Sequence, residues 1–476
     1  MTSIASAGVN KQFLTREHVM KTTRILVQTG ALALSLLASS VMAKVSPEEA
    51  AQLGTALTPI GGLKAGNAAG SIPAWSGGLP TTAGTVDSKG FLSDPFAGEK
   101  PLFVITAATA AQHKDKLTAG QLALFERYPA TYKIPVYPTH RTAALPADIY
   151  PVIKASAVKT EQVDGGNGLS GFADTRYYAF PVPKSGIEVL WNHLTRYRGG
   201  NINRLATRVQ PQANGDFNMV QLADEISYPR ELPDLEKGQA DNILFYFIQR
   251  VTGPARLAGN VLLLHETIDQ VKEPRGAWQY SAGQRRVRRA PQVAYDGPAT
   301  AADGLATADN FDMFNGAPDR YTWELVGKKE LYIPYNSYKL DSPALKYADI
   351  LKTGHINQDL TRYELHRVWE VVAKVKPGQR HIYSTRHMYF DEDTWQLAEV
   401  DHYDGRGQLW RVGEGHAQQY YHKQVPGYTA EVLYDLQSGR YSVLGLKNEE
   451  KRSIEFGAVA SASNYTPAAL RQAGVR

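Results

Sequence analysis

Residues 363–375 read YELHRVWEVVAKV, and the spacing of large apolar residues in this stretch decides the fold class. Most odd positions are apolar, whereas Glu364, His366, Glu370 and Lys374 occupy even positions. Because side chains alternate between the two faces of a strand, this spacing predicts a long strand with one buried face. Lys376-Pro377-Gly378 then marks a turn, and strand-like stretches follow at 380–390 and 395–403. Together they predict an antiparallel meander.

Strands predominate from about residue 174 onward. Asn214-Gly215 is a two-residue hairpin signal between two alternating stretches. Residues 242–251 and 259–269 predict a further pair of strands, and one helix is expected at 184–197, with Ile187, Leu190, Trp191 and Leu194 on one face. The expected fold is mainly β (α+β), a curved antiparallel sheet or incomplete β-barrel with a few covering helices.

The chain before this region has a different character. Ser46, Pro47 and Glu49 form a capping-box pattern, which predicts a short helix that ends at Gly54. Two further helices are expected at 107–116 and 119–127. The long stretch after the first helix is rich in Gly and Pro and has no period, so it predicts a loop that lies across another surface, anchored by Trp75.

Residues 1–43 have the pattern of a cleavable signal peptide, with Met20 as the expected start. Lys21 and Arg24 precede an apolar stretch too short to span a bilayer, and Val41-Met42-Ala43 resembles a cleavage site. The 476-residue chain has a formal charge of +5, and without this leader the charge is +2. The chain has no cysteine, which excludes lipidation, disulfides and thiolate metal sites. We therefore expect a periplasmic, unlipidated protein with an N-terminal region at 44–165 packed on a β domain at 166–476.

Residues 277–291, AWQYSAGQRRVRRAP, place four arginines within five positions. Alternation along a return strand puts Arg286 and Arg288 on one face and Arg285, Val287 and Arg289 on the other. A nucleic-acid surface requires a clustered basic excess, which a nearly neutral mature chain does not supply. The stretch therefore predicts a hairpin with solvated or ion-paired arginines, and an anion contact remains an alternative.

The sequence offers little that resembles a catalytic or metal site. It contains no nucleophile elbow, no phosphate-binding loop and no zinc helix motif, and Asp269 stands where His265-Glu266 would need a second histidine. His381, His387 and His402 lie on neighbouring predicted strands, but histidines on the solvent faces of strands are common. Glu399 and Asp401 are expected to be a solvated pair of acids. No enzyme activity, cofactor or metal is predicted.

Four stretches resemble a known family: LGTALTPIGGLKAGNAAGSIPAWSGGL, PLFVITAATAAQHKDKLTAGQLALFERYPATYKIPVYPTHR, AWQYSAGQRRVRRAP and FDMFNGAPDRYTWELVGKKELYIPYNSY. They resemble the exported Gram-negative family catalogued as domain of unknown function 1329, often labelled outer-membrane lipoprotein-sorting-like. The β-rich portion is similar to the carrier LolA and the receptor LolB. This resemblance implies an incomplete barrel around an apolar cavity that holds acyl chains. It also implies, as partners, an outer-membrane β-barrel protein and a resistance-nodulation-division type exporter.

Two functions from different classes follow. The first is a non-enzymatic periplasmic carrier for a hydrophobic ligand such as a lipid, a sterol-like molecule or an acyl chain, with no nucleic acid as partner. Arg286 and Arg288 would hold a headgroup at the rim. The expected cavity residues, for each of which plain core packing is the alternative, are Trp278, Tyr280, Phe245, Phe247, Leu262, Leu264, Trp369 and Val371.

The second function is an adaptor that bridges an outer-membrane barrel and an inner-membrane exporter without binding a small molecule. The long irregular N-terminal region and the tyrosine-rich stretch at 319–338 favour it, because Tyr and Trp are enriched at interfaces. Whether the cavity is open or filled by the N-terminal region is left open at this point. A lipid hydrolase is a third class, for which no nucleophile and base can be named.

Overall fold

The computed structural model describes residues 45–172, 177–236, 238–290 and 295–475. The predicted signal peptide lies outside these residues. Residues 44–476 cluster into one compact unit. Within the described ranges, no helix has both the length and the apolar character that a membrane crossing requires.

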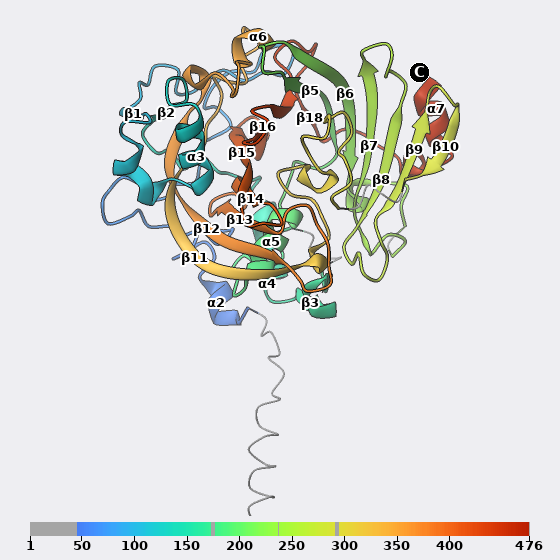
Figure 1. The fold of residues 1–476 in the computed structure, drawn as a ribbon. Coiled ribbons are helices and arrows are strands. Elements are labelled where there is room, and N and C mark those ends of the chain that lie inside the picture. The colour runs from blue at the N-terminus through green and yellow to red at the C-terminus, as the bar shows by residue number, and fades with distance from the viewer. Residues whose placement is uncertain (1–44, 173–176, 237, 291–294, 476) are drawn as a thin grey trace, which may run out of the picture. The chain divides into compact units, whose positions relative to one another are not determined.

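A curved, open sheet dominates this unit (Figure 1). Its neighbouring strands follow the order β1-β2-β12-β13-β14-β15-β16-β17-β5-β6-β7-β8-β9-β10, with β11 also beside β12 and β18 beside β5. The strand β2 runs parallel to β12, and every other pair among the described strands of the sheet is antiparallel. The mainly β fold and the incomplete barrel predicted from the sequence are confirmed.

The strands of the large sheet are β1 (Phe103–Ile105), β2 (Ile134–Val136), β5 (Ile202–Pro211), β6 (Phe217–Ser227), β7 (Ile243–Gly253), β8 (Val261–Thr267), β9 (Gly276–Ser281), β10 (Arg286–Arg289), β11 (Tyr321–Pro334), β12 (Tyr363–Val375), β13 (Thr385–Asp391), β14 (Leu397–Tyr403), β15 (Leu409–Tyr420), β16 (Val425–Asp435), β17 (Tyr441–Leu446) and β18 (Glu455–Phe456). A separate hairpin pairs β3 (Glu161–Val163) with β4 (Gly168–Ser170). The α-helices are α2 (Pro47–Ala51), α3 (Ala119–Arg127), α4 (Ile149–Ala157), α5 (Gly186–Thr195), α6 (Tyr347–Ile350) and α7 (Ala469–Val475). The 3-10 helices are η1 (Ala110–Lys116), η2 (Asp164–Gly166), η3 (Pro229–Glu231), η4 (Ala308–Asn310), η5 (Pro318–Arg320), η6 (Gln358–Leu360) and η7 (Ala462–Tyr465).

Several local predictions match these elements. Ser46 and Glu49 form the predicted capping box at the start of α2, and α3 spans the predicted 119–127. The strand β12 covers the quoted stretch 363–375, and the Asn214-Gly215 turn joins β5 to β6. Short-range signals therefore located these elements well.

The inner face of the sheet curves around α5 and carries the main hydrophobic core (Figure 1). Val189, Leu190 and Leu194 of α5 pack there against Val371 of β12 and Phe390 of β13. Each of these side chains is buried, so the single predicted interior helix fills one end of the concave face.

The N-terminal region packs mainly on the outer face of β14 to β17. Leu124 and Phe125 of α3 belong to a second core together with Val412, Val432 and Tyr434. The Gly- and Pro-rich loop is anchored through Trp75, whose Nε1 donates to the carbonyl of Ala143 at 3.0 Å. These parts of the N-terminal region therefore cover the sheet from outside, whereas Ile60 and, from α4, Ile149 and Ile153 belong to the main core around α5.

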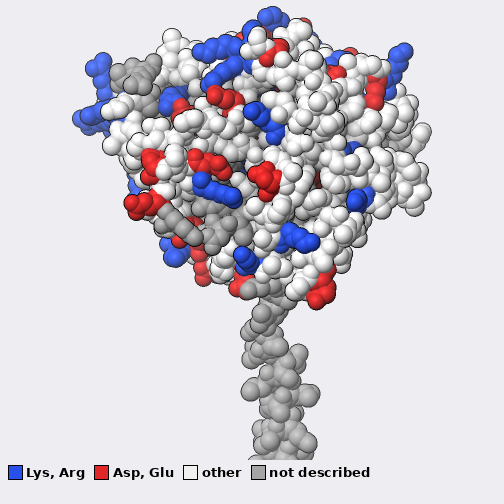
Figure 2. Space-filling view, turned by 180° about the vertical axis from the view of Figure 1, so that it is seen from behind, with Lys and Arg blue, Asp and Glu red and all other residues white. Residues whose placement is uncertain are grey.

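Charged side chains of both signs are interspersed over the face drawn in Figure 2. The hairpin β9–β10 forms as predicted, and Arg285 lies in its turn rather than on the return strand, with φ of 52°. Arg286 and Arg288 are exposed on the edge strand β10.

The C-terminal segment covers the outer face of β6 to β9. Tyr465 stacks on Tyr246 with ring centroids 5.2 Å apart, and its hydroxyl lies 2.7 Å from Ser227 Oγ. Its carbonyl accepts a hydrogen bond from His265 Nε2 at 2.7 Å. Tyr465 and Leu470 are both buried in the same cluster as Leu263. The last part of the chain therefore completes this core.

We expect Tyr465→Ala to lower the free energy of unfolding by about 3 kcal/mol, because it removes a buried aromatic ring. Tyr465→Phe keeps the ring but leaves Ser227 without its partner, and it should cost about 1 kcal/mol. Urea denaturation followed by far-UV circular dichroism measures both values. Equal stability of wild type and Tyr465→Ala would show that the segment does not pack on the sheet.

Candidate functional site

The inner face beyond α5 is covered by residues 298–317, which we call the crossing segment. Apart from the short helix η4, it has no regular secondary structure. Inward side chains of the sheet donate to its carbonyls: Arg208 to Thr300 at 2.6 Å, Arg411 to Gly304 at 2.9 Å, and Gln210 to Ala301. Buried irregular backbone needs such partners, because its carbonyls have no neighbouring strand. These contacts hold the segment against the sheet.

The tip of the crossing segment is anchored at α5. Asp312 and Met313 have φ of 57° and 64°, a left-handed conformation that is uncommon for residues other than glycine. Asp312 accepts from Arg196 and from Arg198, the latter at 2.7 Å. His193 Nε2 lies 3.0 Å from the carbonyl of Asp312. An ion pair and a backbone contact therefore fix a strained turn over the core.

Two clefts lie beside this tip. Cavity A, of about 660 Å³ including space open to solvent, lies between β5–β7 and β15–β16, with Ile202, Ile226, Phe245 and Tyr428 among its walls. Cavity B, of about 500 Å³ on the same measure, lies under the crossing segment against β7 and β8. The two adjoin, because Phe245 and Phe311 line both. Apolar and aromatic side chains form most of the walls of cavity A, as is typical of small-molecule sites, whereas Arg208, Gln249 and Arg275 also line cavity B.

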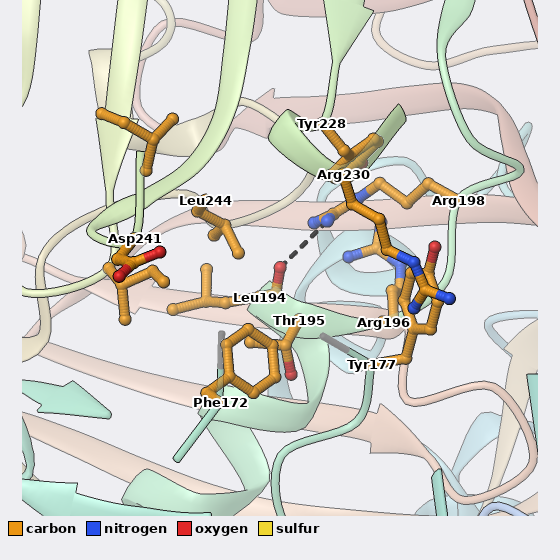
Figure 3. Close-up of a pocket in the computed structure, with 12 residues that line it drawn as sticks. Phe172, Tyr177, Leu194, Thr195, Arg196, Arg198, Tyr228, Arg230, Asp241 and Leu244 are labelled. Carbon is orange, nitrogen blue, oxygen red and sulfur yellow. Dashed lines mark hydrogen bonds between the residues drawn. The ribbon is translucent and has the colours of Figure 1, made fainter. Parts of the chain in front are cut away.

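Two smaller clefts extend these cavities. Cavity C, of about 440 Å³, shares Arg196, Arg198 and Tyr228 with cavity A, and Figure 3 shows these side chains converging above Leu194. The dashed line in that figure is the hydrogen bond from Arg198 to the carbonyl of Leu194, 2.9 Å long. Cavity D, of about 360 Å³, shares Glu431 with cavity A and Arg208 with cavity B. The four clefts therefore adjoin one another along the inner face.

The walls of these clefts combine aromatic rings with buried guanidinium groups. Arg196, Arg198 and Arg204 lie over the rings of Tyr428, Phe245 and Phe311, at 5.6, 6.0 and 5.6 Å from the ring centroids. Cation–π contacts of this kind stabilise a desolvated cation. Such walls can accept both an apolar chain and an anionic group.

Acidic groups balance part of this positive charge. Arg204 pairs with Asp224 at 2.8 Å. Burial opposes ionisation of Asp312, but Arg196 and Arg198 hold the pKa of its carboxyl well below the usual range. Burial, reinforced by the nearby Asp312, raises the pKa of Glu431 to about 7. The walls of these clefts therefore include an acid, Glu431, whose pKa lies near neutral pH.

Four of the residues predicted to form the cavity come together in cavity B, namely Phe245, Phe247, Leu262 and Leu264. Val371 is buried in the same core but lies against Gly186 of α5 and lines none of the four clefts. Trp369 is half-buried and stacks on Trp395, with the ring centroids 6.2 Å apart. Contact with a ligand therefore stays a prediction for the four residues that line cavity B. No cleft described here supports such contact for Val371 and Trp369.

The grouping of Trp278 and Tyr280 with these residues is corrected by the structure. Both lie on the outer face of β9, in the cluster that Tyr465 completes, whereas Ala277 faces the inner core. The sequence shows that residues 278 and 280 share a face, but it does not show which face is concave. Arg286 and Arg288 line none of the four clefts.

The prediction about the two neighbouring acids also changes. Glu399 and Asp401 are buried beneath α3 rather than solvated, with Gln121 donating to Glu399 at 3.0 Å and the Gly120 amide to Asp401 at 3.0 Å. Burial raises the pKa of Asp401 to about 7. The sequence could not reveal this, because the helix that covers these acids comes from a distant part of the chain.

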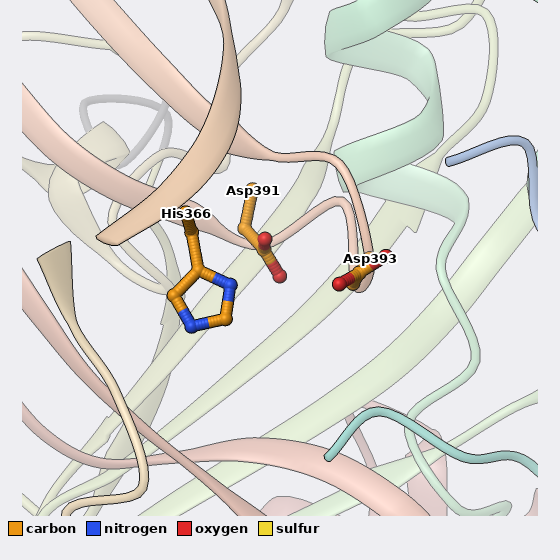
Figure 4. A group of neighbouring side chains, drawn as sticks. All are labelled: His366, Asp391 and Asp393. Atoms are coloured by element: carbon orange, nitrogen blue, oxygen red, sulfur yellow. The ribbon is translucent and has the colours of Figure 1, made fainter. Parts of the chain in front are cut away.

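A different group has the spacing of metal ligands. His366, Asp391 and Asp393 are buried with ligand atoms within 4.8 Å of one another (Figure 4). Both oxygens of Asp393, however, accept hydrogen bonds from Arg141, at 2.7 and 2.6 Å. The guanidinium already supplies the positive charge that a cation would supply. Arg141 also donates to the carbonyl of Leu63, so this cluster connects the N-terminal region to the sheet.

The crossing segment and the arginines of β5 are the functional features that sequence reasoning missed. The segment contains FDMFNGA, the beginning of a stretch that carries the family resemblance, but the sequence predicts no position for it in the fold. Arg204 and Arg208 are four positions apart on a predicted strand, so the sequence places them on the same face. The strand alone does not show that this face points inward.

Comparison with known proteins places the chain in a family. The family described as Protein of unknown function (DUF1329) matches residues 104–471. The uncharacterized protein PA3922 of Pseudomonas aeruginosa is 66% identical over 457 residues, covering 96% of this chain and 100% of that protein. An outer membrane lipoprotein-sorting protein domain from Vibrio parahaemolyticus is 13% identical, with a TM-score of 0.42, over 60% of this chain and 98% of that one. The LolA superfamily protein NE2245 from Nitrosomonas europaea is 10% identical, with a TM-score of 0.36, over 60% and 98%.

The raised pKa of Glu431 predicts a pH dependence of stability. With a pKa of about 7 in the folded protein and about 4.3 in the unfolded chain, this group stabilises the fold at low pH. That contribution is lost as the pH rises through 7. Glu431→Gln stays neutral, so relative to wild type it should gain about 2 kcal/mol between about pH 5.5 and pH 8.5. Urea denaturation at both pH values measures the difference, with Glu126→Gln at an exposed position as the control. A constant difference would contradict the assignment.

Proposed function

Since this chain belongs to the DUF1329 family, whose function is unknown, we infer its function from its own cavities. We propose that it is a non-enzymatic periplasmic binding or carrier protein for a hydrophobic ligand. The observation that carries this proposal is the pair of adjoining clefts A and B on the inner face. Phe245 and Phe311 line both, so one elongated ligand can occupy both. Burial of each methylene of such a ligand contributes about 0.8 kcal/mol.

The crossing segment supports the same proposal. It closes the inner face without being a strand of the sheet. Hydrogen bonds, the ion pairs of Asp309 with Arg386 and of Asp312 with Arg198, and apolar contacts such as that of Phe311 with Phe247 hold it there. Displacing it exposes the clefts while the strand pairing stays intact. A carrier needs such a route by which a ligand enters and leaves. The N-terminal region lines none of the four clefts, which supports a cavity that is open to a ligand.

We predict that a larger side chain in cavity B displaces the ligand. Leu262→Trp should lower lipid retention at least tenfold at a cost of about 1–3 kcal/mol in stability, because the added ring fills the space beside Phe247. Native mass spectrometry of protein purified without detergent and then incubated with membrane lipid extract measures the adduct. Met219→Trp, at an exposed position on β6, is the matched control. A wild-type protein that stays bare would refute the carrier function.

A second candidate function is an adaptor between envelope proteins, and the edge strand β1 favours it. β1 pairs only with β2 in the described chain, and Leu102, Phe103 and Val104 are 65%, 38% and 40% exposed. An edge strand with exposed apolar side chains can pair with a strand of another protein. The partners considered are an outer-membrane β-barrel protein and a resistance-nodulation-division type exporter.

We expect the double variant Leu102→Glu/Val104→Lys to abolish cross-linking to the barrel protein if the adaptor function holds, because charges on an edge strand oppose pairing. Cross-linking in cells followed by identification of the captured membrane protein is the measurement. Met219→Glu changes an exposed apolar residue elsewhere and should have no effect. Full cross-linking of the double variant would exclude this edge.

A further inference from the structure

Arg208 is an unusual side chain on the inner face. It projects from β5 between cavities B and D and is only 7% exposed. One terminal nitrogen donates to the carbonyl of Thr300 at 2.6 Å. Its Nε is buried and has no hydrogen-bond partner. Part of its hydrogen-bonding capacity is therefore unused.

The neighbouring arginines differ from it in that each pairs with a carboxylate. Arg196 and Arg198 share Asp312, Arg204 pairs with Asp224, and Arg275 pairs with Glu266 at 2.8 Å. For Arg208, no carboxylate of the described residues lies within 4.0 Å. Glu431 and Asp224 act on it only from a greater distance. A buried charge without a counter-charge is costly, so this position is incomplete in the protein alone.

The group is nevertheless a cation at neutral pH. Burial lowers the pKa of Arg208 to about 10, which still leaves the guanidinium protonated at pH 7. Guanidinium groups bind carboxylates and phosphates with two parallel hydrogen bonds. The unused hydrogen-bonding capacity of Arg208 suits an oxygen anion.

The surroundings of Arg208 are apolar on one side. In cavity B it stands beside Phe245, Phe247, Leu262, Leu264 and Phe311. A cation at one end of an apolar cleft matches a molecule with an anionic head and an apolar chain. Neither a fully apolar ligand nor a small free anion uses both features.

We infer that the ligand is an anionic amphiphile, whose carboxylate or phosphate contacts the guanidinium of Arg208 while its apolar chain lies along Phe245 and Leu262 in cavity B. This inference rests on the proposed carrier function and names the class of its ligand. It places the head in the interior of the protein, whereas the sequence placed it on Arg286 and Arg288 at the rim.

The test compares ligands that share one chain and differ in the head. Dodecanoate, dodecyl phosphate and dodecanol are titrated into the purified full chain by calorimetry below their micellar concentrations, together with acetate and inorganic phosphate. We expect the two anionic amphiphiles to bind about 10- to 100-fold more tightly than dodecanol, because a hydrogen bond to a charged group accounts for such a factor. The headgroups alone should bind far more weakly than the amphiphiles.

Variants then assign the preference to one side chain. Arg208→Gln should reduce the anion-to-alcohol ratio to within a fewfold, and Arg208→Lys should restore most of it. The double variant Arg286→Gln/Arg288→Gln is the matched control and should keep the full ratio. If Arg286→Gln/Arg288→Gln lost the preference for anionic amphiphiles over dodecanol while Arg208→Gln kept it, the inference would be overturned in favour of Arg286 and Arg288.

The remaining outcomes separate the inference from the function on which it rests. Equal affinity for the alcohol and the anions overturns the anionic head and leaves the carrier function standing. Binding of acetate or phosphate as tight as that of the amphiphiles overturns the apolar part. No binding of any probe counts against the carrier function itself. Urea denaturation of Arg208→Gln without ligand checks that the variant is folded, because the substitution also removes the guanidinium donor to the Thr300 carbonyl.

Discussion

A sheet that curves without closing has a concave apolar face that no second sheet covers, and the rest of this structure depends on how that face is shielded from water. The chain uses α5 at one end and the crossing segment over the remainder. A helix satisfies its own backbone, but an irregular segment does not, so its carbonyls must find donors in the sheet. Arg208, Gln210 and Arg411 supply them.

This solution explains why charged residues stand on an apolar face. Arginine combines a long apolar stem with several hydrogen-bond donors. It can therefore reach a carbonyl across a core while cation–π contacts with aromatic rings stabilise its charge. Once the arginines are inside, acids such as Asp312 and Asp224 are required to balance them. The buried charges are therefore a consequence of covering the sheet with an irregular segment. The same arrangement leaves cavities beside the cover, since a loop does not pack as densely as a second sheet.

The sequence predicted the elements and missed their faces. Alternation and turn signals placed β12, α3 and the Asn214-Gly215 hairpin, because each depends on residues close together in the chain. Phe245, Phe247, Leu262 and Leu264 were grouped rightly, since β7 and β8 are neighbours with a clear period. Trp278 and Tyr280 were misplaced because the choice between two buried faces depends on Tyr465, nearly 200 residues away. The prediction that Glu399 is solvated is wrong for a similar reason, because α3, which covers it, comes from a distant part of the chain.

The position of the C-terminal segment has a consequence for biosynthesis. Tyr465 and Leu470 cover Leu263 and Tyr246, which are made some two hundred residues earlier. Until residues 465–470 pack on these strands, their outer surface has no cover. A chain in that state exposes apolar strand surface, which is the condition under which chaperones bind. The order of residues along the polypeptide thus makes the packing of this segment a late step of folding.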